Sequence, residues 1–288
     1  MVRKILKHSF IKIVVISLLF TSCNKPTNEI KPSNENTLFS LVDSQITNIH
    51  FKNKITESLY FNFINYPYIY NGGGVAVGDI NNDGLEDLYF TANQGPNKLY
   101  LNKGNLQFED ITEKANFTDE LGWSTGVTMV DINNDGFLDI YVCKSGSLES
   151  HELRKNKLYI NQQNNTFKES AAEYGLNHVG FSVQAYFFDF DLDNDLDLYL
   201  VNHREDFQNN TFINPEIQQD IQDYSSDQLF RNDGGRFENI TTQAGVANKA
   251  WGLSASIGDF NNDNLPDIYV ANDFLEPDFL YINQGNGT

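Results

Sequence analysis

A nine-residue motif occurs four times in this chain, and its repetition constrains the fold more than any other feature. The copies span residues 79–87, 131–139, 189–197 and 259–267. Each copy has Asp or Asn at positions 1, 3, 5 and 9. In a tightly turning loop these alternate side chains point inward, where they can supply the six to eight oxygen ligands that calcium takes at about 2.3–2.6 Å. The sequence therefore predicts up to four Ca²⁺ sites, and we call these four segments the metal loops.

The ligands of each predicted site come from five positions of its loop. Positions 1, 3, 5 and 9 supply side-chain oxygens, and position 7 supplies its backbone carbonyl. Position 6 is Gly or Asn in every copy, and these residue types enter the left-handed backbone conformation at the lowest cost. The candidate metal ligands are Asp79, Asn81, Asp83, Leu85, Asp87, Asp131, Asn133, Asp135, Phe137, Asp139, Asp189, Asp191, Asp193, Asp195, Asp197, Asp259, Asn261, Asp263, Leu265 and Asp267.

The EF-hand is one alternative, because its loop also begins Asp-x-Asn-x-Asp-Gly. An EF-hand needs a Glu at position 12 and a helix on each side of the loop. Position 12 here is Phe90, Val142, Leu200 or Val270. Runs rich in β-branched and aromatic residues flank the loops, so the loops are predicted to join strands.

Solvated acidic turns are a second alternative, since Asp, Asn and Gly dominate turns for conformational reasons. A plain turn does not need a carboxylate at position 9, where an apolar run begins. We therefore prefer metal binding for the loops at 79–87 and 131–139 above all, while Pro266 and the missing glycine weaken the signal of the fourth loop.

The repeat extends well beyond the metal loop. A tyrosine always follows at position 11, then a second marker such as 97–102, and then, in the first three units, a third such as 108–112. Each complete unit thus holds four short strands, which is typical of the blades of a β-propeller. The predicted fold is an all-β propeller with the calcium-binding loops between strands 1 and 2 of each blade. The blades span about 72–116, 122–174, 180–244 and 251–288 within a repeat domain at 41–288.

The link between the second and third strands varies most in length, and its longest copy lies between Tyr199 and Phe230. In a meander of four strands this link lies on the face opposite the metal loops, and insertions in repeat proteins gather on one, often binding, face. Its aromatic, basic and amide residues suit a sugar or peptide surface, whereas the alternative is a solvated excursion with a short helix. The candidate ligand-binding residues are Arg204, Phe207, Phe212 and Tyr224.

These units resemble FG-GAP repeats, also called VCBS repeats, which form the integrin α-chain propeller and occur in many bacterial surface proteins. The resemblance covers residues 72–288, although the Phe-Gly and Gly-Ala-Pro signature is absent and the match is to the calcium-loop half of the motif. Residues 68–84 are also similar to the start of secreted bacterial proteins that resemble cartilage acidic protein. The resemblance implies a calcium-stabilised propeller that binds partners on the face opposite the metals.

The N-terminus has the features of an export signal at residues 1–22. Basic residues precede an apolar stretch too short to span a bilayer, and the segment 20–23 resembles a bacterial lipobox that ends in Cys23. We expect acylation of Cys23 and a flexible tether at 23–40, which would anchor the exported protein in the bacterial cell envelope, at the outer membrane or the cell surface. A soluble secreted protein with a free Cys23 is the alternative.

Composition limits the partners. The formal net charge is −19, so nucleic acid is an unsuitable ligand, because binding a polyanion requires basic patches. Cys143 is the one cysteine in the repeat region and is expected to be a small buried hydrophobe rather than half of a disulfide. The expected partners are an extracellular glycan or protein and, through the lipid anchor, the membrane.

The last unit stops where the others supply their third marker, so we expect a fragment of a larger propeller. The alternative is a four-blade ring in which residues 50–57 supply the missing strand. No nucleophile elbow, Walker loop, zinc motif or Cys-x-x-Cys occurs. We therefore predict a calcium-binding surface lipoprotein whose propeller is a binding module and not an enzyme, with an extracellular lyase or hydrolase as the alternative.

Overall fold

The computed structural model describes residues 38–117, 122–146, 150–204, 223–274 and 276–286. The chain divides into a first unit at 1–42 and a second at 43–288. Of the first unit only residues 38–42 are described, and they form no helix or strand. Everything that follows concerns the second unit.

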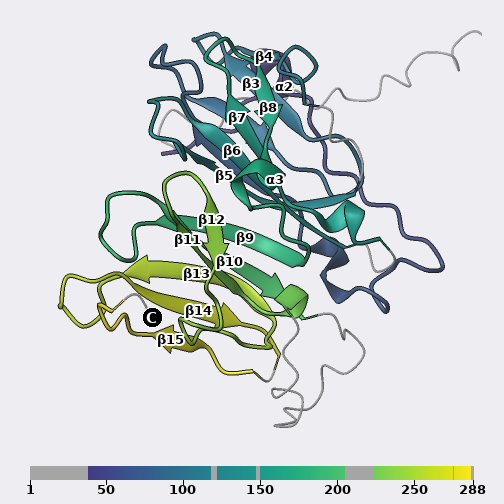
Figure 1. Ribbon diagram of the computed structural model, residues 1–288. Coiled ribbons are helices and arrows are strands. Elements are labelled where there is room, and N and C mark those ends of the chain that lie inside the picture. The colour runs from purple at the N-terminus through teal and green to yellow at the C-terminus, as the bar shows by residue number, and fades with distance from the viewer. Residues whose placement is uncertain (1–37, 118–121, 147–149, 205–222, 275, 287–288) are drawn as a thin grey trace, which may run out of the picture. The chain divides into compact units, whose positions relative to one another are not determined.

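The second unit is built from four antiparallel sheets that follow one another along the chain (Figure 1). Three sheets have four strands in sequential order, and the last has three among the described residues. The strands of the first two sheets are β1 (Val75–Gly78), β2 (Asp87–Phe90), β3 (Lys98–Asn102), β4 (Phe108–Asp110), β5 (Trp123–Val130), β6 (Asp139–Ser145), β7 (Lys157–Asn161) and β8 (Phe167–Glu169). Those of the other two are β9 (Phe181–Phe188), β10 (Asp197–His203), β11 (Gln228–Asn232), β12 (Phe237–Asn239), β13 (Gly252–Gly258), β14 (Asp267–Asn272) and β15 (Phe279–Tyr281).

Neighbouring sheets meet through their first strands. β5 contacts β1 and β9, and β13 contacts β9 and β10. The approach is close at Gly126, where a Cβ atom would lie 2.0 Å from Oε1 of Gln184. The side-chain hydroxyl of Thr128 also donates to the carbonyl of Ala185 at 2.8 Å. This arrangement of meanders with inner first strands is that of consecutive propeller blades, as the repeat pattern predicts.

The core lies between the sheets. One cluster joins the first two sheets, with Tyr89 and Tyr159 buried in it, a second joins the second and third, and a third joins the third and fourth. All seven residues of β6 and all seven of β10 are buried, because sheets cover both sides of these strands. In β1, by contrast, Val75 and Val77 remain exposed. Cys143 is fully buried in β6, as expected for a small hydrophobe.

Short helical turns complete the unit: α2 (Ser44–Thr47), η1 (Pro67–Tyr70), η2 (Glu152–Arg154), α3 (Ala171–Tyr174) and η4 (Asp223–Ser225). Among the described residues, no helix has the length and apolar character needed to cross a membrane.

The segment before β1 does not complete the last sheet. Phe51 stacks on Phe90 of the first sheet with ring centroids 5.0 Å apart, and the backbone N–H of Thr56 donates to Oε1 of Gln94. Residues 50–57 form no strand, so the four-blade ring closed by this segment is wrong. Residues 50–57 instead contact side chains of the first sheet. Their resemblance to the third marker does not predict these contacts.

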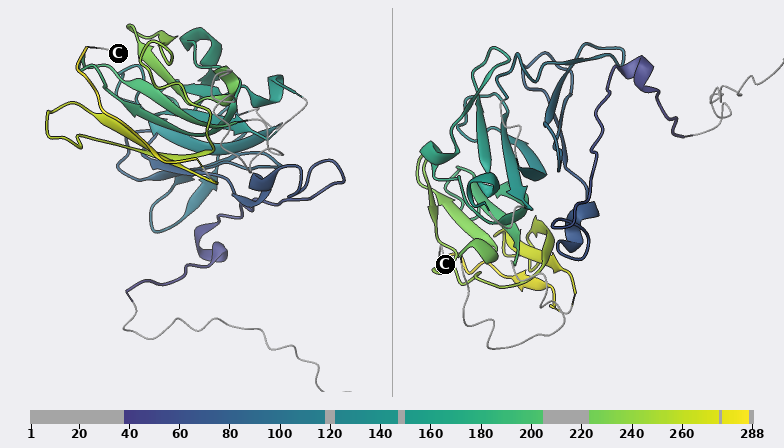
Figure 2. Two further views of the ribbon diagram at one scale, coloured as in Figure 1. Left: turned by 90° about the horizontal axis from the view of Figure 1, so that it is seen from below. Right: turned by 90° about the vertical axis from the view of Figure 1, so that its right-hand side faces the viewer.

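After this segment the chain turns onto the ends of the inner strands. In the right view of Figure 2 the blue segment that contains η1 runs down toward the yellow strands of the last sheet. Tyr68 in η1 packs against Trp251, beside β13, and stacks on His203 at the end of β10. Tyr68 and Trp251 form a fourth buried cluster together with Tyr66, Ile69, Trp123 and Phe181. We call residues 66–70 the N-terminal plug.

Candidate metal loops

The carboxylate at position 1 organises each metal loop. Oδ1 of Asp79 accepts the backbone N–H of Asp83 at 3.1 Å, and its Oδ2 accepts that of Gly84 at 2.7 Å. The same two bonds, to the N–H groups of positions 5 and 6, recur at 2.8–3.1 Å in the other loops, from Asp131, Asp189 and Asp259. The position 5 carboxylate in turn accepts the N–H of position 7 in all four.

Two positions of every loop have left-handed backbone. Position 6 does so as predicted, with φ between 70° and 85° at Gly84, Gly136, Asn194 and Asn264. Position 4 does so as well, with φ of 59°, 56° and 64° at Asn82, Asn134 and Asn262. The third loop has Leu192 there, at φ 63° with half of its side chain exposed. Leucine has no side-chain oxygen to stabilise this conformation, so the third loop is strained at this point.

The carboxylate at position 9 is fully buried and connects three segments. In the first loop, Oδ2 of Asp87 accepts the N–H of Ile80 at 3.0 Å, and Oδ1 accepts the N–H of Asn102 at 2.7 Å. The same pair of bonds recurs at Asp139, Asp197 and Asp267. The carboxylate at position 9 therefore links the start of its own loop to the end of the third strand, whether or not it also binds a metal.

Burial opposes the charge of these carboxylates. It raises the pKa of Asp87 to about 6 and the pKa values of Asp139 and Asp197 to about 7, with smaller upward contributions from the neighbouring carboxylates. At position 1 of the first loop, burial of Asp79 is outweighed by the N–H groups of Gly84 and Asp83, which lower its pKa. A cation in the loop would favour the charged form of all these groups.

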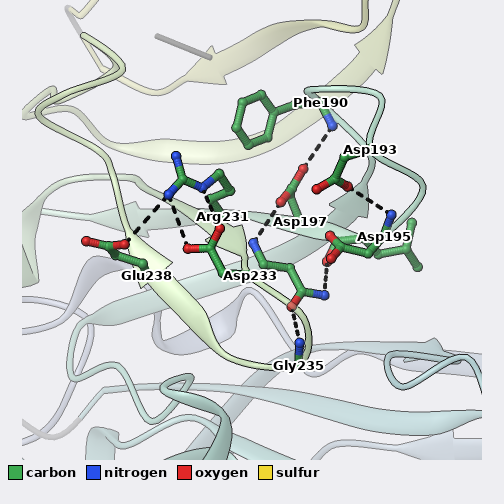
Figure 3. Close-up of polar contacts among 10 residues, drawn as sticks. Phe190, Asp193, Asp195, Asp197, Arg231, Asp233, Gly235 and Glu238 are labelled. Atoms are coloured by element: carbon green, nitrogen blue, oxygen red, sulfur yellow. Dashed lines mark hydrogen bonds and ion pairs between the residues drawn. The ribbon is translucent and has the colours of Figure 1, made fainter.

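The third loop carries the most carboxylates of the four. Figure 3 shows three of them, Asp193, Asp195 and Asp197, beside Arg231. Carboxylate oxygens of Asp189, Asp191 and Asp197 lie within 4.8 Å of one another. Oδ1 of Asp195, at position 7, is buried with no hydrogen-bond partner among the described residues. The nearby Arg231 pairs with Asp233 at 3.0 Å and approaches Glu238 at 3.7 Å. Burial and the neighbouring carboxylates raise the pKa of both Asp191 and Asp195.

The donor set fits a hard cation. Side-chain oxygens from positions 1, 3 and 9 converge in the third loop, and one further buried oxygen there has no donor. In the other loops an Asn at position 3 replaces one carboxylate and contacts position 5, as Asn81 does with Asp83 at 3.1 Å. All these donors are oxygens, which suits Ca²⁺ rather than a soft metal. Strands flank every loop, which excludes the EF-hand.

Adjacent loops also contact each other. The amide of Asn82 donates to the carbonyl of Gly136 in the second loop at 2.9 Å. The amide of Asn161, at the end of β7, donates to the carbonyl of Ile80 at 2.8 Å, and Asn283 donates to Phe190 at 2.7 Å. These contacts attach the second sheet to the first metal loop and the fourth sheet to the third metal loop.

The sequence markers supply further polar contacts that sequence reasoning did not assign. The asparagine at the end of each second marker donates its backbone N–H to the position 9 carboxylate. These asparagines are Asn102, Asn161, Asn232 and Asn283. The residue that opens the marker accepts a backbone N–H from the end of the second strand, as Asn156 does from Lys144 at 2.7 Å. In the third sheet, the tyrosine at position 11, Tyr199, donates to Asp227 at 3.0 Å. Because these marker residues recur along the chain, their repetition is the sequence signal that could have identified the contacts.

The structure describes two of the four residues that are predicted to bind a ligand. Arg204 is 2% exposed, pairs with Glu276 at 2.5 Å and lies over the ring of Trp251. Because Glu276 and the ring of Trp251 already engage this guanidinium, the expected ligand role of Arg204 is corrected to that of a buried ion pair. Tyr224 is half-buried, with its ring edge-on to His151. Phe207 and Phe212, like Cys23, lie outside the described residues.

Comparison with known proteins agrees with this geometry. The family profile of the FG-GAP-like repeat matches residues 79–142 and 221–270. Cartilage acidic protein 1 of Xenopus tropicalis is 40% identical over 72 residues, which is 25% of this chain and 11% of that protein. The Mus musculus protein is 38% identical over 69 residues, covering 24% of this chain, and the Homo sapiens protein 38% over 72, covering 25%. Each match spans 11% of the relative's length. The chain therefore carries FG-GAP-like repeats and is homologous, over about a quarter of its length, to cartilage acidic protein 1.

Proposed function

We propose that this chain is the calcium-binding FG-GAP-like propeller of an exported cell-envelope lipoprotein, and that it serves as a binding module for an extracellular glycan or protein. The observation that carries the proposal is the fourfold recurrence of one loop geometry. In each loop the carboxylate at position 1 accepts the N–H groups of positions 5 and 6, and the carboxylate at position 5 accepts that of position 7. Four independent copies of one ligand arrangement are expected of a loop that is built for an ion.

Electrostatics supports calcium as the ion. The third loop places five carboxylates at alternate positions of nine residues, from Asp189 to Asp197. Mutual repulsion among these carboxylates costs free energy, and a bound dication offsets it. Loops that bind calcium would fasten neighbouring sheets at one face and leave the other face to a partner.

Isothermal titration with Ca²⁺, and with Mg²⁺ as the control, tests the metal. Calcium should bind more tightly than magnesium, because Mg²⁺ keeps its water and demands octahedral geometry. Replacing position 5 of one loop, as in Asp135→Ala, should remove one site and leave the others. Equal heats for the wild type and this variant would contradict the assignment of that loop.

Retention of labelled polysaccharides tests the binding role. Capture in calcium that is lost in EDTA supports a binding module. Release of shorter fragments, by contrast, would favour the lyase or hydrolase alternative.

Fractionation tests the membrane anchor. The natural protein should sediment with membranes and incorporate labelled palmitate, and Cys23→Ser should abolish both, because an acyl chain supplies about 0.8 kcal/mol per buried methylene. Palmitate incorporation that survives this substitution would rule out Cys23 as the acylated residue.

A further inference from the structure

A cavity of about 460 Å³ lies among the inner strands, beneath the N-terminal plug. The first strand of every sheet, or the residues just before it, contributes to its wall. We call it the inner cavity. It reaches the surface at Asn71 and Leu253, both exposed, and its volume is in the range of about 300–1,000 Å³ typical of small-molecule sites.

The wall of the inner cavity is aromatic and uncharged. Tyr66, Tyr68 and Trp123 line it, with amide and hydroxyl groups from Gln184 and Thr125, and no Asp, Glu, Lys or Arg is among its described lining residues. A charged ligand would be buried there without a counter-ion, which is costly, so the wall favours a neutral one.

His203 lines the same cavity and has an unmet hydrogen bond. Its side chain is 3% exposed, and its Nδ1 has no partner among the residues that the structure describes. The imidazole is stacked on Tyr68, with centroids 4.0 Å apart and planes 10° apart, and it hydrogen-bonds the backbone of Gly252. Burial lowers the pKa of His203 to about 3, so the ring is neutral at pH 7 and can accept a hydrogen bond.

A buried acceptor without a donor is unfavourable, and a ligand hydroxyl would satisfy it. Aromatic faces offer flat contact area to a sugar ring, and amides offer adaptable hydrogen bonds. We infer that the inner cavity binds one or two rings of a neutral saccharide, which contact Tyr66, Tyr68 and Trp123 where these residues line the cavity and donate a hydroxyl proton to Nδ1 of His203. The inference rests on the proposed binding function, which it makes specific in site and ligand class.

The N-terminal plug belongs to this site as one of its walls. The hydroxyl of Tyr68 donates to Asp273 at 3.2 Å, and that of Tyr66 lies 3.2 Å from the hydroxyl of Ser145, so both rings are held in place. A ligand in the inner cavity would thus contact the N-terminal plug, which precedes the first sheet, and the inner strands at the same time.

The test uses the full chain in calcium with glucose, galactose, mannose, maltose, cellobiose and lactose. Galacturonic acid and choline serve as charged probes. We expect at least one neutral sugar to bind in calorimetry and to move the ¹⁵N resonance of His203 Nδ1. A panel in which no neutral sugar binds, or in which a charged probe binds more tightly, overturns the inference.

His203→Phe keeps an aromatic ring but removes the acceptor, so sugar affinity should fall at least tenfold. The melting temperature should change little, because loss of the bond to the backbone of Gly252 offsets removal of the unpaired Nδ1. His178→Phe is the matched control. Nε2 of His178 is also buried and unpartnered within the described part of the chain, but the residue is absent from the cavity lining, and affinity should stay the same. Equal affinity in wild type and His203→Phe contradicts the inference. Should His203→Phe not fold, the ¹⁵N shift in the wild type decides.

The same samples separate this inference from the proposed function. If polysaccharide is captured equally by wild type and His203→Phe, and free sugars do not compete, the binding module stands and the inner cavity is not its site. If calcium does not bind and nothing is captured, the proposed function itself fails.

Discussion

Asp197 and Asn232 join the third metal loop to the end of β11, because Oδ1 of the fully buried Asp197 accepts the backbone N–H of Asn232 at 2.8 Å. Its Oδ2 accepts the N–H of Phe190 at 3.0 Å (Figure 3). One side chain thus satisfies two buried backbone donors, and this role does not depend on any metal.

Asp197→Asn should therefore destabilise the protein even in EDTA. An amide has one acceptor oxygen, so one backbone N–H would face an NH₂ group, at a cost of about 1–3 kcal/mol. Urea unfolding measures it. The matched control is Asp193→Asn, which is exposed and keeps an oxygen for the N–H of Asp195, so it should cost less than about 0.5 kcal/mol. Equal losses would mean that position 9 has no special structural role.

Leu192→Asn should stabilise the third loop. The left-handed conformation costs leucine about 1–2 kcal/mol, whereas asparagine adopts it readily and occupies position 4 in the other loops. We expect a gain of about 1 kcal/mol in the free energy of unfolding. Leu192→Ala keeps the strain and should give no such gain, so a similar gain from alanine would refute this explanation.

Much of the fold could be predicted because each metal loop repeats with its flanking strands. The alternating Asp and Asn residues located the turn between strands 1 and 2 of each sheet, and the order of the markers indicated four-stranded meanders. The course of residues 50–70 could not be predicted in this way. Their contacts with Phe90, Gln94 and Trp251 join residues distant in the sequence and occur once, so no repetition signals them.

The candidate site was predictable in part for the same reason. Alternating carboxylates indicated the loops, but the sequence could not show that position 9 is bonded to the end of the third strand. Nor could it show that Arg204 points inward, because a basic residue beside an insertion is ordinarily exposed. Its partner Glu276 lies 72 positions away.

The stability of the calcium-free protein should fall as pH rises from 5 to 8. The pKa values of Asp87, Asp139 and Asp197 in the folded protein, about 6, 7 and 7, lie above the usual value of 3.8. The folded state therefore holds these protons more tightly than the unfolded state. The resulting stability is fully present below about pH 4 and is lost as pH rises through 6 to 7.

Calcium should reverse this trend, because it binds the deprotonated carboxylates. Melting temperatures across this range in EDTA and in calcium measure both slopes. A melting temperature that rises with pH in EDTA would be incompatible with buried, protonated carboxyls at position 9.

The most direct test of the metal loops is calorimetric melting of the wild-type chain in calcium and in EDTA at pH 7.5, with magnesium as the control ion. A ligand that binds the native state alone adds about 2.7 kcal/mol per site at a hundredfold excess over Kd, and each kcal/mol raises the melting temperature of a domain of this size by roughly 2–4 °C. We predict a rise of at least about 5 °C in calcium and a smaller one in magnesium. An identical melting temperature in calcium and in EDTA would contradict the account.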